Sequence, residues 1–198
     1  WGGERYALLM VLPPDPELAG TRRLSKETIF VIDTSGSMGG TSIRQARAAL
    51  THALRRMNPN DAFNVIRFDS TVERLHDGAR PVSPSAIRDA VDWVSGLEAR
   101  GGTEMLPALK AALAHGEERR AVRQIIFITD GAVGNESALL AVIQKDLGRS
   151  RLYTVGIGSA PNSHFMSKAA EFGRGTFTYI ATPEEVAARM GELFAKLD

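Results

Sequence analysis

The chain has 198 residues, of which 43% are hydrophobic and 24% are charged, a balance typical of one soluble globular domain. Its 24 basic and 23 acidic residues leave a net charge of +1, which gives no overall electrostatic reason to bind nucleic acid or a membrane surface. There is no cysteine, which excludes disulfides and thiolate chemistry, and no apolar run of the roughly 18 residues needed for direct membrane insertion.

The first 24 residues contain one short apolar run, Tyr6–Leu12, which Pro13 and Pro14 end. This pattern predicts a strand followed by a linker. The chain starts with neither an initiator methionine nor a signal peptide. We therefore expect residues 1–24 to be a junction with a missing preceding domain, and residues 25–198 to form the main domain.

From residue 28 onward, apolar runs that are typical of strands alternate with segments whose apolar residues recur at helical spacing. Strands are expected at residues 28–32, 63–68, 71–75, 122–129, 152–157 and 175–180. Helices are expected at residues 42–57, 83–97, 105–115, 137–147 and 162–172, and from residue 182 onward.

Local motifs predict how some of these elements begin and connect. Ser42 and Gln45 match a capping box at the start of the first helix. Ser83 is expected to cap the second helix, with proline at its first helical position. Only Asp69 and Ser70 separate the second and third strands, so we expect those strands to form an antiparallel hairpin.

The alternation of strands and helices predicts an α/β fold with a doubly wound, mostly parallel six-stranded sheet and one antiparallel edge strand. The strands are almost continuously apolar, which indicates that helices cover both faces of the sheet. With the strand order 3-2-1-4-5-6, the order reverses between strands 1 and 4, and ligands bind at such a reversal beyond the carboxyl ends of the strands.

Five oxygen-bearing side chains converge on that reversal. Asp33, Ser35 and Ser37 follow the first strand, and Asp130 follows the fourth. Thr103, in a glycine-rich loop before a helix, is expected to reach the same edge. Carboxylates and hydroxyls are hard ligands that suit Mg²⁺, Mn²⁺ or Ca²⁺. Hydroxyls are weak ligands that leave the ion electrophilic, so an incoming carboxylate is a suitable last ligand.

These residues resemble the metal ion-dependent adhesion site of von Willebrand factor type A domains, whose motif is D-x-S-x-S with a distant threonine and a distant aspartate. Asp33, Ser35 and Ser37 match the first part, Thr103 the second and Asp130 the third. The resemblance implies that all five residues ligate the metal and that the fold is Rossmann-like.

Three longer segments of the sequence indicate which type A domains this chain resembles most. The segments Ile29–Met38, Ser42–Ala46 and Asp61–Asn64 are most similar to the type A domains of inter-alpha-trypsin inhibitor heavy-chain-like proteins. Among bacterial proteins, they are similar to the marine proteobacterial sortase target proteins. The resemblance covers roughly residues 25–198, and it implies a parent protein that is exported and anchored at the cell surface by a sorting signal outside this sequence.

The leading hypothesis is therefore a non-enzymatic adhesion or protein-interaction module whose divalent ion binds an acidic side chain of a protein partner. The first alternative is a Mg²⁺-dependent phosphate-ester hydrolase, since an acid-ended strand with Mg²⁺ also serves phosphoryl transfer. Against it, the sequence has no Walker-type loop, and no lysine follows Asp33 in its loop. The second alternative is an intracellular type A domain that helps to assemble a larger machine.

Overall fold

Strand β1 (Lys26–Asp33) lies at the centre of the sheet, and all eight of its residues are buried. The computed structural model describes residues 10, 24–114, 121–131 and 133–197. The strand expected at residues 6–12 therefore lies, apart from Met10, outside the described residues. Side chains along β1 alternate between the two faces, so Phe30 and Ile32 enter one hydrophobic core while Ile29 and Val31 enter the other.

The order of the strands matches the order predicted from the sequence. The sheet runs β3-β2-β1-β5-β6-β7, and β1 is parallel to both β2 and β5. The hairpin predicted between β2 and β3 is confirmed as an antiparallel pair. The strands beside β1 are β2 (Ala62–Phe68), β3 (Val72–Arg74), β5 (Val122–Thr129), β6 (Arg151–Ile157) and β7 (Phe177–Ile180).

Two local predictions were wrong. In the described part of the chain the sheet has seven strands rather than six, because the short strand β4 (Arg80–Pro81) also pairs with β2. The predicted capping box is absent: helix α1 (Thr41–Arg55) begins one residue earlier, after Gly40, whose φ is 74°. The side chain of Gln45 turns away from the helix start and donates from Nε2 to the Ala181 carbonyl at 3.0 Å.

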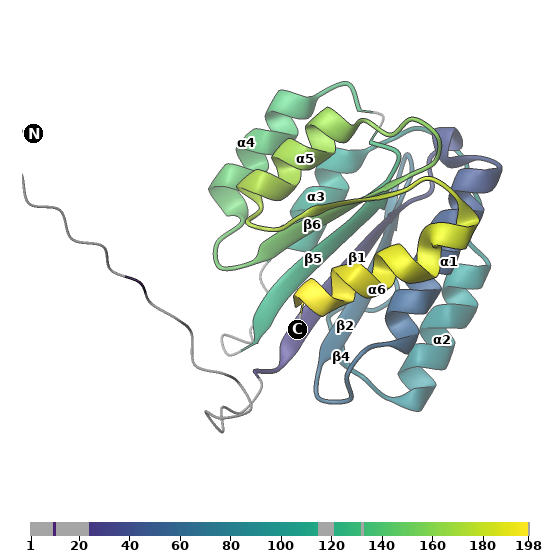
Figure 1. The fold of residues 1–198 in the computed structure, drawn as a ribbon, viewed down its shortest axis with the longest axis vertical. Helices are drawn as coiled ribbons and strands as arrows, with labels where there is room; N and C mark the ends of the chain where they lie inside the picture. Colours follow the sequence, from purple (N-terminus) through teal and green to yellow (C-terminus); the bar gives the residue numbers. More distant parts are fainter. Residues whose placement is uncertain (1–9, 11–23, 115–120, 132, 198) are drawn as a thin grey trace, which may run out of the picture.

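Helices cover both faces of the sheet (Figure 1). On one face lie α1, α2 (Pro84–Ser95) and α6 (Val186–Leu197). On the other lie α3 (Met105–Leu113), α4 (Glu136–Asp146) and α5 (Ser163–Phe172). The predicted cap of α2 is confirmed, since Ser83 Oγ accepts a hydrogen bond from the Ala86 amide at 3.1 Å. No helix in the described part of the chain is long and apolar enough to span a bilayer.

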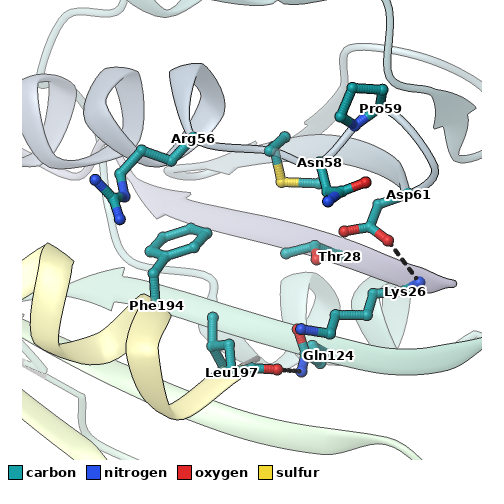
Figure 2. Close-up of a pocket in the computed structure, with 10 residues that line it drawn as sticks. Lys26, Thr28, Arg56, Asn58, Pro59, Asp61, Gln124, Phe194 and Leu197 are labelled. Atoms are coloured by element: carbon teal, nitrogen blue, oxygen red, sulfur yellow. Dashed lines mark hydrogen bonds between the residues drawn. The ribbon is translucent and has the colours of Figure 1, made fainter. Parts of the chain in front are cut away.

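The edge where β1 begins carries a hollow of about 310 Å³ (Figure 2). The Lys26 amide donates to Asp61 Oδ1 at 3.0 Å, which joins β1 to the turn before β2. Gln124 Nε2 donates to the Leu197 carbonyl at 3.1 Å and so holds the last turn of α6 against β5. The residues predicted to bind metal lie at the opposite ends of the strands.

Candidate functional site

The carboxylate of Asp33 is buried at the carboxyl end of β1 and is held through both of its oxygens. The Ser35 amide donates to Oδ1 at 2.8 Å, and Thr129 Oγ1 donates to Oδ2 at 2.5 Å. Burial raises the pKa of Asp33, the hydrogen bonds from Ser35 and Thr129 lower it, and the charge of Asp130 raises it further. No ion pair found among the described residues includes Asp33.

The turn after β1 places the two serine hydroxyls side by side. Ser35 precedes the short 3₁₀ helix η1 (Gly36–Met38), and the hydroxyl oxygens of Ser35 and Ser37 are 3.1 Å apart. Ser35 is buried while Ser37 is exposed, so one of the two hydroxyl-bearing residues lies in the interior and the other lies at the surface. The hydroxyl of Thr34 instead donates from Oγ1 to the Phe68 carbonyl at 3.0 Å.

The loop that carries Thr103 is hydrogen-bonded directly to the turn after β1. The Arg100 amide donates to the Thr34 carbonyl at 2.7 Å, and the Gly36 amide donates to the Gly101 carbonyl at 3.1 Å. These bonds bring the half-buried Thr103 to the edge that also carries Ser35 and Ser37.

The conformation of this loop depends on glycine. The φ of Gly101 is 68°, in the left-handed region that side chains rarely adopt. A Cβ atom there would lie 2.8 Å from Ser70 Oγ, which itself accepts a 2.8 Å hydrogen bond from the Gly102 amide. The close approach of this loop to Ser70 therefore requires glycine at position 101.

Asp130 follows β5 at the same edge of the sheet. Its charge contributes to the raised pKa of Asp33. The Asp130 carbonyl accepts from the Asn162 amide at 2.9 Å, and the Gly131 amide donates to Thr129 Oγ1 at 2.9 Å. The five residues singled out from the sequence thus occupy three adjoining segments that meet at one edge.

A third strand-end carboxylate was missed. Asp69 follows β2, and its Oδ2 accepts from Arg67 Nη1 at 2.8 Å and from Arg100 Nε at 3.3 Å. Its Oδ1 accepts from the Thr71 amide at 2.8 Å, and its carbonyl accepts from the Glu104 amide at 2.8 Å. Asp69 therefore supports the loop around Thr103. Its position directly after a strand, like that of Asp33, was the signal that could have identified it.

The donor set has the chemistry of a hard divalent cation. It offers two carboxylates and three hydroxyls, and hard cations take oxygen ligands. A metal site built mainly from carboxylates would need several acidic residues close together. The described residues contain no group of three or more His, Cys, Asp or Glu that could hold a metal. Burial of Asp33 disfavours its charged form, and a cation beside it would offset that cost. The residues present therefore fit a metal held largely by neutral hydroxyls.

Comparisons with known proteins identify the family of this chain. A family model of the von Willebrand factor type A domain matches residues 26–179. A von Willebrand factor A domain-containing protein of Dictyostelium discoideum is 32% identical over 171 residues, which cover 85% of this chain and 19% of that protein. Human inter-alpha-trypsin inhibitor heavy chain H4 is 29% identical over 191 residues, or 90% of this chain and 20% of that one.

Solved structures share the fold. A von Willebrand factor type A structure from Catenulispora acidiphila superposes with a TM-score of 0.79 at 24% identity, over 87% of this chain and 42% of that one. The pilus adhesin SpaC of Lactobacillus rhamnosus GG superposes with a TM-score of 0.71 at 12% identity, over 89% of this chain and 31% of that one. The chain spans a fifth or less of the curated relatives named above. It belongs to the von Willebrand factor type A family.

Proposed function

We propose that this chain is a metal-dependent adhesion or protein-interaction module that binds an acidic group of a partner protein through a divalent cation. Von Willebrand factor type A domains generally serve as interaction or adhesion modules. The observation that carries the metal dependence is the buried Asp33 carboxylate, which is fixed by two hydrogen bonds and lies beside a row of hydroxyls.

In this proposal Asp33, Ser35, Ser37, Thr103 and Asp130 hold Mg²⁺, Mn²⁺ or Ca²⁺. The ion supplies an electrophilic position for a carboxylate from the partner. The exposed Ser37 and the half-buried Thr103 and Asp130 lie toward solvent, where a partner side chain has access, while Asp33 and Ser35 lie beneath. The buried residues thus anchor the site, and the outer ones face the partner.

We propose an extracellular or cell-surface location for the parent protein. Support comes from proteins with the same fold whose roles are at the surface, including the pilus adhesin SpaC and a minor pilin of Streptococcus sanguinis, the latter with a TM-score of 0.69. An export signal in the full-length gene is the expected finding, and a parent gene without one would contradict this part.

The metal dependence is tested with a random peptide library displayed on phage and selected on the protein in Mg²⁺. We expect the selected peptides to carry Asp or Glu, to be released by excess EDTA, and not to bind the Asp33→Asn variant. The matched control is Asp146→Asn, which changes an exposed carboxylate on α4 and is expected to bind normally. Peptides that stay bound in excess EDTA, or that bind without an acidic residue, would contradict the proposal.

A further inference from the structure

A second concave surface lies along the outer side of α1. It is a groove of about 750 Å³ that α1 forms with the end of α2 and the start of α6. Helix α1 packs against both α2 and α6, which lie beside it in Figure 1. We call it the arginine groove, because Arg44, Arg47, Arg55 and Arg56 line it. It is separate from the strand-end site, since none of the five proposed metal ligands lines it.

The arginine groove carries positive charge without matching negative charge. Glu184 is the acidic residue among those that line it. No ion pair found in the described residues includes any of the four arginines; Arg44 Nη2 donates to Thr41 Oγ1 at 3.0 Å, and Arg47 Nη1 donates to a carbonyl at 3.4 Å. Figure 2 shows the Arg56 guanidinium on the far side of the neighbouring hollow from Asp61. These guanidinium groups therefore remain available to an anionic partner.

The spacing of the arginines makes a stripe along the helix. Arg44, Arg47 and Arg55 lie at i, i+3 and i+11, which places them on one side of α1 over a rise of about 16 Å. Arg44, Arg55 and Arg56 are exposed. Guanidinium groups bind carboxylates through paired hydrogen bonds, so a stripe of this length matches a row of acidic side chains.

The wall of the groove is apolar beside the arginines. Ala48, Val186 and Ala187 line it with short side chains that leave room for an apolar group. His52 also lines it; burial and then the charge of Arg56 lower the pKa of this imidazole, so the positive charge of the groove at pH 7 comes from the arginines. A concave site with an apolar wall and a basic stripe fits a single peptide segment better than a flat bilayer or a duplex.

We propose that the arginine groove docks an acidic amphipathic segment of a partner protein. The carboxylates of the segment contact Arg44, Arg47 and Arg55, and an apolar residue lies against Ala48 and Ala187. This docking does not require metal. A partner that also engages the strand-end site would then be held at two places on the domain, which increases the overall affinity through effective concentration.

The test uses a fluorescent peptide of about twelve residues, with leucine at helical spacing and glutamate elsewhere, long enough to span the stripe. Binding is followed by anisotropy in excess EDTA, so that failure of the metal proposal does not affect the outcome. We expect saturable binding that weakens as NaCl is raised and falls about tenfold or more in the Arg44→Glu, Arg55→Glu double variant. Arg149→Glu, an exposed site after α4, is the matched control and is expected to bind normally.

A second variant tests the groove without changing charge. Ala187→Trp places a large side chain in the groove at the exposed start of α6. We expect it to weaken peptide binding about as much as the double arginine variant does. Unfolding curves of all variants check that each one is folded. Absence of saturable peptide binding, or an equal loss in Arg149→Glu, overturns the proposal. Binding of duplex DNA or phosphatidylserine vesicles that depends on Arg44 and Arg55, in place of the peptide, also overturns it.

Discussion

Thr129 donates a 2.5 Å hydrogen bond to Oδ2 of Asp33, and this bond joins the ends of two neighbouring parallel strands. Because the Ser35 amide donates to Oδ1, the carboxylate is fixed through both oxygens. Thr129 in turn accepts from the Gly131 amide, which ties the segment around Asp130 to the same carboxylate. One threonine hydroxyl thus couples the acidic groups of the candidate metal site.

Replacing Thr129 removes this coupling. Thr129→Val keeps the shape of the side chain but leaves Oδ2 of Asp33 and the Gly131 amide without their bonds to the Thr129 hydroxyl, so we expect a loss of about 1–3 kcal/mol in the free energy of unfolding. We also expect Mg²⁺ affinity to fall about 10–100-fold, as for other residues that orient metal ligands. Urea unfolding and calorimetry measure the two effects. Thr129→Ser retains the hydroxyl and is the control; an equal loss in it would contradict the role of the hydrogen bond.

The Thr103 loop depends on a glycine in the left-handed region. Gly101→Ala forces a side chain into φ of 68° and against Ser70 Oγ, so we expect the protein to lose about 1–2 kcal/mol of stability and the Thr103 loop to shift. The control is Gly78→Ala, where a Cβ atom has nothing within 4 Å. Thermal unfolding and amide chemical shifts compare the two variants. Identical shifts around Thr103 would show that the close approach of the loops is not needed.

Asp69 should make stability depend on acid pH. Burial alone raises the pKa of Asp69, but hydrogen bonds from Thr71 and Arg100 and the charge of Arg67 outweigh burial and lower it. A lowered folded pKa means that the unfolded chain binds the proton more tightly, so the contribution is complete above about pH 4 and is lost as pH falls through the folded value.

The corresponding variant is Asp69→Asn. We expect it to be less stable than the original chain at pH 7 by about 1–3 kcal/mol, and the difference to narrow as pH falls below about 4. Urea unfolding at a series of pH values measures the difference. A gap that stayed constant down to pH 2, or that widened in acid, would contradict the inferred direction of the pKa shift.

Metal binding should stabilise the folded domain. For a site that exists only in the folded chain, Mg²⁺ at 100 times its Kd is expected to add about 2.7 kcal/mol to the free energy of unfolding. We expect Mg²⁺ to add almost no stability to Asp33→Asn. The control variant Asp146→Asn changes an exposed residue of α4, and we expect Mg²⁺ to stabilise it as much as the original chain. Equal stabilisation of all three proteins would place the metal elsewhere.

The order of the strands could be predicted from the sequence because the strands are apolar almost throughout and alternate with amphipathic helices. Strand β4 could not, because Arg80–Pro81 is too short to show alternation and contains a proline. The start of α1 was misplaced because the capping motif was read from residue types alone. Gly40 begins the helix, and Gln45 bonds to the loop before α6, which lies far away in sequence.

Much of the candidate site followed from the rule that ligands bind beyond the carboxyl ends of strands where the strand order reverses. That rule brought together Asp33 and Asp130. The bond between Thr129 and Asp33 required the register, in which Ile32 pairs with Ile128, and register is a property of the folded sheet. The same rule applied to β2 would have identified Asp69, whose role in holding the Thr103 loop depends on arginines brought from two segments.

The central claim is tested most directly by crystals grown with Mn²⁺ and measured for anomalous scattering. We expect one peak at the carboxyl end of β1, bounded by the oxygens of Ser35, Ser37 and Thr103, with Asp33 and Asp130 on its inner side. The peak should be absent in Asp33→Asn. A map with no peak among these oxygens, or with a peak that persists unchanged in Asp33→Asn, would contradict the account.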